Sequence, residues 1–257
     1  MAKTALITGA SAGIGRELSK LMAKDGYELF LVARDAARLN ELAVELKTLG
    51  APDAHVISVD LAAKSGAAQV AAALSKTLPD VLVNNAGFGL LGSFSGIELA
   101  RQMDMIQVNV TSLVELTGLL LPRMVARGSG RILNLASTAA FQPGPGMAIY
   151  YATKAFVLSF SEAIAEENRN KGVTVTVLCP GPTDTEFQTR AGMLGTPLFS
   201  GKFKIMTAKE VAEIGYRAML EGKVLTIAGL RNRLGMEGLR LAPRSWVRKI
   251  AYKLHKT

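Results

Sequence analysis

A tyrosine and a lysine four residues apart are the side chains of this sequence best suited to move a proton. They lie in Tyr150-Tyr151-Ala152-Thr153-Lys154, within an apolar-periodic stretch that predicts a helix over residues 148–170. Tyr150 and Lys154 then share one helical face. A phenol ionises near pH ~10 in water, and a nearby ammonium lowers this pKa. The pair therefore predicts a general acid and base acting on an oxygen atom.

Tyr151 is the alternative proton carrier. The residue four positions after it is Ala155, which has no charge. Only Tyr150 is followed by a cation on the same helical face, so we assign proton transfer to Tyr150.

The cysteine and histidine residues of this sequence do not indicate a disulfide or a metal site. The single cysteine, Cys179, excludes an internal disulfide and a thiolate metal cluster. His55 and His255 lie far apart without ligand-like spacing, which is more typical of surface or strand-edge residues. We therefore expect no metal site, and the chemistry must come from other side chains or from an organic cofactor.

A glycine-rich turn follows the first predicted strand. It holds Gly9, Ser11, Gly13, Ile14 and Gly15 in G-x-x-x-G-x-G spacing, and a helix is predicted from Gly13. Glycines in this place let the backbone approach a pyrophosphate at a helix N-terminus. The alternative is a tight turn that needs glycine for packing alone. Its position between the first strand and the first helix favours a nucleotide site.

The end of the second strand indicates which nucleotide is bound. An NAD-specific fold usually places an acid there to bind the ribose 2′-hydroxyl, but this sequence has Ala33 followed by Arg34. The guanidinium of Arg34, with Arg38 one turn later, suits a 2′-phosphate. The alternative is two solvated arginines at a helix start; we favour NADP(H). Asp60 either meets the adenine edge or caps the next helix.

Apolar runs alternate with periodic stretches along the chain. The runs predict strands at residues 4–8, 28–33, 55–59, 81–84, 131–136, 173–179 and 224–228. The periodic stretches predict helices at residues 13–24, 36–49, 64–77, 99–126, 148–170 and 208–221. This alternation predicts one α/β domain over residues 1–257, with a doubly wound parallel sheet flanked by helices.

Four motifs stand in register on these elements. They are the glycine-rich turn, Asn84-Asn85-Ala86-Gly87, Asn134-Leu135-Ala136-Ser137, and Tyr150 to Lys154. Together they resemble the compact branch of the short-chain dehydrogenase/reductase family, over the chain up to about Ala228. The resemblance implies a Rossmann-type fold and hydride exchange between a nicotinamide cofactor and a carbonyl or alcohol substrate.

The resemblance also implies roles for single residues. Ser137 would hold the substrate oxygen beside Tyr150, Lys154 would hold the ribose, and Asn109 would support Lys154 through water. Read without the resemblance, Asn109 is a buried structural amide. Thr183 would offer its backbone, and Thr185 its hydroxyl, to the nicotinamide. The expected cofactor contacts are Gly9, Ser11, Gly13, Ile14, Gly15, Arg34, Arg38, Asp60, Leu61, Asn85, Ala86, Gly87, Tyr150, Lys154, Pro180, Gly181, Thr183 and Thr185.

Two segments follow the sixth strand with weaker patterns. Residues 185–205 predict a substrate lid. Residues 230–257 form a basic tail that predicts a helix from Pro243, with an apolar stripe of Trp246, Val247, Ile250 and Leu254. This stripe either packs on the body or a second subunit, lies on an anionic membrane, or docks an acidic protein.

Charge and hydropathy narrow the remaining partners. The net charge is +9, of which residues 223–257 carry +8. The excess is confined to the tail, and zinc-finger and RNP signatures are missing, so we expect no nucleic-acid partner. No uninterrupted apolar run spans a bilayer, and the first apolar stretch does not predict a signal peptide. We expect a cytoplasmic homo-oligomer.

These inferences predict an NADP(H)-dependent reductase of ketones or aldehydes. The tail resembles, less specifically, long-chain ketone and 3-ketoacyl reductases, which suggests a hydrophobic or 3-oxoacyl substrate. The alternative is a cofactor-binding regulatory protein without turnover. The intact set of Ser137, Tyr150 and Lys154 argues against this alternative.

Overall fold

The structure is a computed structural model that describes residues 2–75, 77–199, 205–239 and 242–255. Its centre is a sheet of seven parallel strands in the order β3-β2-β1-β4-β5-β6-β9. The strands are β1 (Thr4–Thr8), β2 (Glu28–Ala33), β3 (Ala54–Ser58), β4 (Val81–Asn84), β5 (Gly130–Leu135), β6 (Val173–Cys179) and β9 (Leu225–Ile227). The predicted doubly wound parallel sheet is confirmed, with strand ends shifted by at most one residue.

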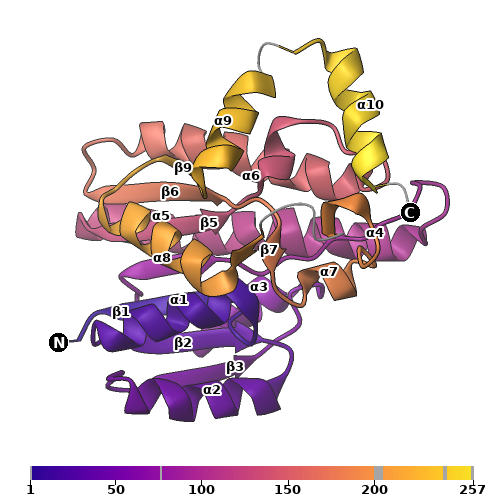
Figure 1. Ribbon diagram of the computed structural model, residues 1–257. Helices are drawn as coiled ribbons and strands as arrows, with labels where there is room; N and C mark the ends of the chain where they lie inside the picture. Colours follow the sequence, from indigo (N-terminus) through magenta and orange to yellow (C-terminus); the bar gives the residue numbers. More distant parts are fainter. Residues whose placement is uncertain (1, 76, 200–204, 240–241, 256–257) are drawn as a thin grey trace.

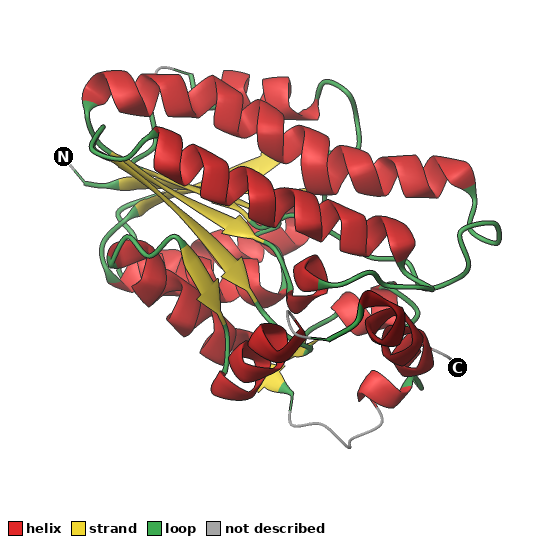
Figure 2. Cartoon of the chain, turned by 90° about the horizontal axis from the view of Figure 1, so that it is seen from above, coloured by secondary structure: helices red, strands yellow, loops and turns green. Residues whose placement is uncertain are grey.

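Helices cover both faces of the sheet (Figures 1 and 2). One layer consists of α1 (Gly13–Lys24), α2 (Ala36–Thr48) and α8 (Ala208–Leu220). The other consists of α3 (Gly66–Ala73), α4 (Leu99–Ile106), α5 (Ser112–Arg127) and α6 (Ala148–Glu167). The predicted third helix, residues 64–77, is observed only from Gly66 to Ala73.

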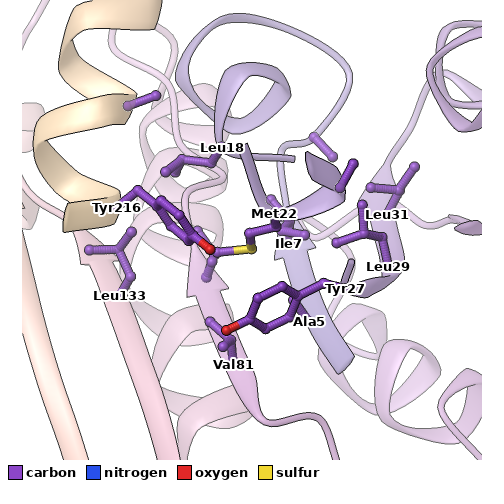
Figure 3. Packing of buried hydrophobic residues seen from close by; sticks show 14 of the residues in the cluster. Ala5, Ile7, Leu18, Met22, Tyr27, Leu29, Leu31, Val81, Leu133 and Tyr216 are labelled. Carbon is purple, nitrogen blue, oxygen red and sulfur yellow. The ribbon is translucent and has the colours of Figure 1, made fainter. Parts of the chain in front are cut away.

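Strands without polar alternation are buried on both faces, as parallel strands require. In the first layer, Leu18 and Met22 of α1 and Tyr216 of α8 pack on the sheet (Figure 3). In the opposite layer, Leu116, Leu120 and Met124 of α5 pack on Leu6, Leu82 and Ile132. These two apolar layers fix the strand ends that carry the site residues.

The predicted helix over residues 99–126 contains a π-helical turn. The turn, Gln107–Thr111, joins α4 to α5 and brings Asn109 to the interior, where its side chain is 1% exposed. Such turns recur at functional sites because the inserted residue redirects its neighbours. By length and composition alone, the whole helix, Leu99–Arg127, is long and apolar enough to cross a membrane. In this fold its inner face packs on the sheet.

The segments after β6 contain short elements that the sequence pattern did not predict. They are β7 (Thr183–Asp184), α7 (Phe187–Arg190), the 3-10 turn η3 (Pro197–Phe199), β8 (Met206–Thr207) and α9 (Leu230–Leu239). Pairing of β7 with β8 places the residues that precede and follow the predicted lid, residues 185–205, side by side. Residues 200–204 of this lid lie outside the described residues.

The predicted tail helix is observed as α10 (Arg244–His255), directly after Pro243. Its predicted apolar stripe is divided between two faces. Val247 is buried, whereas Trp246 and Ile250 are exposed. Residues 240–241 and 256–257 of the tail lie outside the described residues.

A buried chain of polar side chains fastens α6 to the centre of the sheet. The Asn84 amide donates to Thr117 Oγ1 at 3.1 Å and to Asn134 Oδ1 at 2.9 Å. The Asn134 amide donates in turn to Ser161 Oγ of α6 at 2.9 Å. In a dry interior each lost partner leaves a polar group unsatisfied.

We expect Asn134→Ala to lower the free energy of unfolding by about 2–4 kcal/mol, because it opens a cavity and removes a partner from two buried groups. Urea unfolding measures this change. Asn40→Ala on the exposed face of α2 is the control and should shift stability by less than about 0.5 kcal/mol. Equal unfolding midpoints for the two variants would contradict the assignment.

Candidate active site

The carboxyl ends of β1, β4, β5 and β6 border one cleft. The strand order reverses between β1 and β4, and ligands of open α/β sheets bind beside such a switch point. Many of the predicted site residues line this cleft together: Gly9, Ser11, Gly13, Ile14, Asn85, Ala86, Gly87, Ser137, Tyr150, Lys154, Pro180, Gly181, Thr183 and Thr185.

Hydrogen bonds between Thr8 and Asn85 hold the two strand ends at the switch point together. The Asn85 amide donates to the carbonyls of Thr8 at 2.9 Å and Gly9 at 3.1 Å. The Thr8 hydroxyl accepts from the backbone N–H groups of Asn85 and Ala86, both at 3.0 Å. Sequence reasoning missed this role of Thr8, because the partners are 77 and 78 residues away.

The glycine-rich turn forms a cradle that a side chain would fill. Gly9 has a φ of +66°, and a Cβ there would lie 2.7 Å from Asn85 Nδ2 and 2.9 Å from the Ala86 Cα. No side chain caps α1, because Ala12 stands at its N-cap, so its first N–H groups are left for a ligand. This floor of backbone at a helix N-terminus fits the pyrophosphate of a dinucleotide.

Tyr150 and Ser137 form the reactive end of the cleft. Tyr150 lies in the first turn of α6, and Ser137 follows β5. Burial raises the pKa of Tyr150 to about 12, although a hydrogen bond with Ser137 acts in the opposite direction. The Ser137 hydroxyl oxygen accepts from the backbone N–H of Ala139 at 3.1 Å, and the hydroxyl donates to the carbonyl of Pro180 at 3.4 Å. Because this donated bond is long, the hydroxyl proton can turn towards a substrate oxygen.

The ammonium of Lys154 lies at the base of the cleft. It donates to the Leu135 carbonyl at 2.7 Å and lies 5.8 Å from the centroid of the Tyr150 ring. The side chain is only 6% exposed, and burial lowers the pKa of Lys154 to about 8. The sequence predicted that this ammonium, together with the positive ring of an oxidised nicotinamide cofactor, lowers the pKa of Tyr150. In the protein without cofactor, desolvation of the phenol is the largest influence on this pKa and raises it, so the lowering in the cofactor complex stays a prediction.

Asn109 supports the wall beside Lys154. Its side chain is bonded to both backbone groups of Phe88, at 3.0 Å each, and donates to Thr153 Oγ1 at 3.1 Å. A Cβ on Gly87 would lie 3.1 Å from Asn109 Oδ1 and 3.4 Å from Lys154 Nζ. Asn109 thus joins the strand end after β4 to α6, and its predicted support of Lys154 through water stays a prediction.

Several predicted contacts lie outside the cleft lining: Gly15, Arg34, Arg38, Asp60, Leu61 and Asn109. Asp60 Oδ1 accepts from the backbone N–H of Ala62 at 2.9 Å. It does not cap the next helix, whose N-cap is Ser65, and its predicted contact with the adenine stays a prediction. Leu61 is buried, and its carbonyl accepts from Ser112 at 2.7 Å. The two arginines lie at the ribose end, beside the second strand.

A family model described as short chain dehydrogenase matches residues 3–193. The chain belongs to this family. Ketoacyl reductase HetN of Nostoc is 34% identical over 219 residues, which are 84% of this chain and 75% of that protein. The protein is therefore an oxidoreductase whose family binds a nicotinamide cofactor and small-molecule substrates.

Two solved structures of the family carry different cofactors. A short-chain dehydrogenase from Sphingobium yanoikuyae, in complex with NADPH, has a TM-score of 0.83 and 33% identity, covering 96% of this chain and 97% of that chain. A family member from Burkholderia phymatum, in complex with NAD, has a TM-score of 0.79 and 25% identity, covering 93% and 95%. The preference of this dehydrogenase for a cofactor with or without the 2′-phosphate must therefore be inferred from its own residues.

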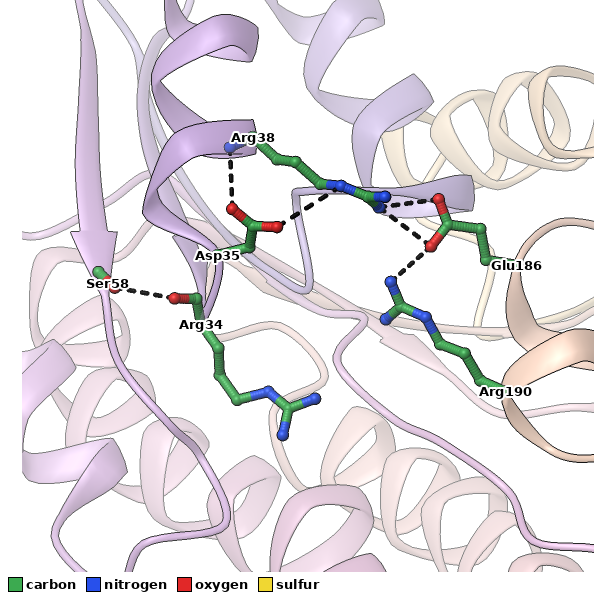
Figure 4. Close-up of polar contacts among 6 residues, drawn as sticks. All are labelled: Arg34, Asp35, Arg38, Ser58, Glu186 and Arg190. Carbon is green, nitrogen blue, oxygen red and sulfur yellow. Dashed lines mark hydrogen bonds and ion pairs between the residues drawn. The ribbon is translucent and has the colours of Figure 1, made fainter.

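The ribose end of this dehydrogenase carries an ion-pair cluster (Figure 4). Arg38 Nη1 lies 2.8 Å from Glu186 Oε1 and 3.0 Å from Oε2, and its Nε lies 3.5 Å from Asp35. Glu186 also pairs with Arg190 of α7. Arg38, which the sequence predicted to bind a 2′-phosphate, thus already forms ion pairs with two carboxylates. Among the described residues no carboxylate pairs with Arg34, whose guanidinium points away from the cluster.

The other end of the dehydrogenase cleft is apolar. Buried Met147, Ala191 and Met193 pack there with Leu91, Tyr150, Tyr151, Phe187 and Phe199. Sequence reasoning missed this pocket. Its members come from a proline-rich loop, from the lid segment and from α6, and neither loop has the regular period that reveals a buried face. The ring of Phe187 in this pocket lies 5.2 Å from the ring of Tyr150, between centroids.

We expect Tyr150→Phe to lower the kcat of ketone reduction by about 10²- to 10⁴-fold, because it removes the proton donor. Binding of NADPH, followed by fluorescence titration, should stay within a few-fold. The matched control is Tyr151→Phe, whose ring lies 6.1 Å away between centroids. Full activity of Tyr150→Phe, or equal losses in both variants, would refute the assignment.

Proposed function

We propose that this dehydrogenase is an NADP(H)-dependent reductase of hydrophobic ketones or aldehydes. The observation that carries the proposal is the apolar pocket around Met147, Met193 and Phe199, placed beside Tyr150. A substrate carbonyl held by Ser137 and Tyr150 would extend its hydrocarbon part into this pocket. The similarity to ketoacyl reductase HetN, whose name describes a substrate with a carbonyl and an acyl chain, supports this class.

The bound cofactor supplies the hydride that adds to the carbonyl carbon. Tyr150 donates its phenolic proton to the carbonyl oxygen, while the hydroxyl of Ser137 donates a hydrogen bond to the same oxygen. Burial holds the pKa of Tyr150 at about 12, so this acid is protonated at neutral pH. A protonated phenol is the form that reduction requires. Lys154 contributes positive charge beside the phenolate that remains after proton transfer.

The residues at the ribose end support NADP(H) over NAD(H). Ala33 leaves the end of β2 without an acid that would repel a phosphate. Arg34 is exposed and unpaired among the described residues, so its guanidinium is available for a 2′-phosphate. Arg38 is partly neutralised by Glu186 and Asp35. We therefore assign the larger share of phosphate recognition to Arg34.

We expect Arg34→Ala to weaken NADPH binding by about 10- to 100-fold, which is the contribution of a hydrogen bond between charged groups, and to leave NADH binding unchanged. Titrations of cofactor fluorescence measure both dissociation constants. Arg38→Ala should have a smaller effect, because Glu186 already occupies that guanidinium. If Arg34→Ala weakens NADH and NADPH equally, or neither, the assignment is wrong.

We expect kcat/KM for methyl ketones to rise by up to about fourfold per added methylene until the pocket is filled, since burying a methylene contributes about 0.8 kcal/mol. The measurement is NADPH consumption across a chain-length series. Met193→Ser, at a side chain 3% exposed, should flatten this rise, whereas Met103→Ser, 54% exposed, should not. A kcat/KM that is constant or falls with chain length in the unaltered protein would contradict a hydrophobic substrate.

A further inference from the structure

The helix α10 has two unlike faces. Val247 and Ala251 are 5% and 1% exposed, so this face is packed. Trp246 and Ile250, one turn apart, are 65% and 59% exposed. Helical spacing places Lys249 and Lys253 on the same side as this apolar pair. The helix thus presents a large aromatic and an aliphatic side chain to solvent, with two lysines beside them.

The packed face of α10 connects it to the substrate end of the cleft. The helix contacts η3, and Phe199 of η3 lines both the cleft and the apolar pocket. In Figure 1, α9 and α10 stand together at the top of the molecule, beyond β9. The exposed face of α10 therefore lies on the outer side of the wall that encloses the substrate.

The cationic side chains of α10 form no ion pairs within the described part of the chain. Arg244, Arg248, Lys249 and Lys253 are all exposed, and in the described part of the chain no carboxylate lies within ion-pair distance of any of them. Residues 223–257 as a whole carry +8. An external surface of negative charge is the complement of this face.

We propose that the outer face of α10 binds the surface of a bilayer that contains anionic lipids. Trp246 and Ile250 insert at the level of the headgroups, and Lys249 and Lys253 lie against lipid phosphates. An acidic protein would neutralise the cations but would also need an apolar patch for Trp246 and Ile250. A bilayer supplies both at once. Membrane binding would bring the enzyme to a hydrophobic carbonyl substrate, which is concentrated in the bilayer. This benefit rests on the proposed function.

The full chain offers a direct probe, because Trp246 is its only tryptophan. We expect its emission to shift to the blue when vesicles of phosphatidylcholine with phosphatidylglycerol are added, and the protein to sediment with them. Added salt should weaken this binding. Vesicles of phosphatidylcholine alone should leave the emission unchanged or shift it far less.

The variant Lys249→Gln/Lys253→Gln should bind the anionic vesicles about 25-fold more weakly, because each cation near such a surface contributes about fivefold. The control Lys24→Gln/Lys64→Gln removes the same charge from exposed positions elsewhere and should bind as the unaltered protein does. Both variants should reduce a short, water-soluble ketone at the unaltered rate without vesicles. That assay tests the proposed function separately from the membrane contact.

Three results would overturn the proposal. The first is an unchanged Trp246 emission with anionic vesicles. The second is a shift produced by an acidic polypeptide such as polyglutamate but not by vesicles, which would indicate a protein partner. The third is a blue shift that grows with protein concentration in the absence of vesicles, which would show that a second copy of the chain covers this face.

Discussion

The active site depends on keeping the ammonium of Lys154 charged in a place where water scarcely reaches. Burial works against the charge and lowers the pKa of Lys154 to about 8. The Leu135 carbonyl, at the carboxyl end of β5, compensates with a hydrogen bond of 2.7 Å. This bond requires α6 to lie at a fixed height along β5, and the buried chain from Asn84 through Asn134 to Ser161 holds it there.

The same requirement shapes the neighbouring elements. A Cβ on Gly87 would lie 3.1 Å from Asn109 Oδ1, so a side chain there would press on Asn109. Asn109 reaches this position through the π-helical turn, which buries its side chain. Desolvation that lowers the pKa of Lys154 also raises that of Tyr150 to about 12. A single dry cleft therefore yields a cation and a protonated phenol next to each other.

Local sequence patterns were sufficient to predict those features that depend on residues close together in the chain. The period of α6 put Tyr150 and Lys154 on one face, and uninterrupted apolar runs located the parallel strands. The π-helical turn, the bonds of Thr8 and the pairing of Arg38 with Glu186 depend on partners distant in the chain, so no local pattern predicted them. Burial of the Tyr150 phenol, which raises its pKa, is likewise a tertiary property that no local pattern predicted.

The segment from Glu186 to Phe199 contacts both ends of the cleft, one through an exposed ion pair and the other through buried apolar side chains. Its first residue, Glu186, pairs with Arg38 at the ribose end, and the exposed charges there are screened by water. Its last residues pack Met193 and Phe199 into the apolar pocket, where burial gives the stronger hold. Opening the segment therefore costs least at the ribose end. An anionic ligand that competes with Glu186 for Arg38 would loosen this weak end and leave the substrate wall in place.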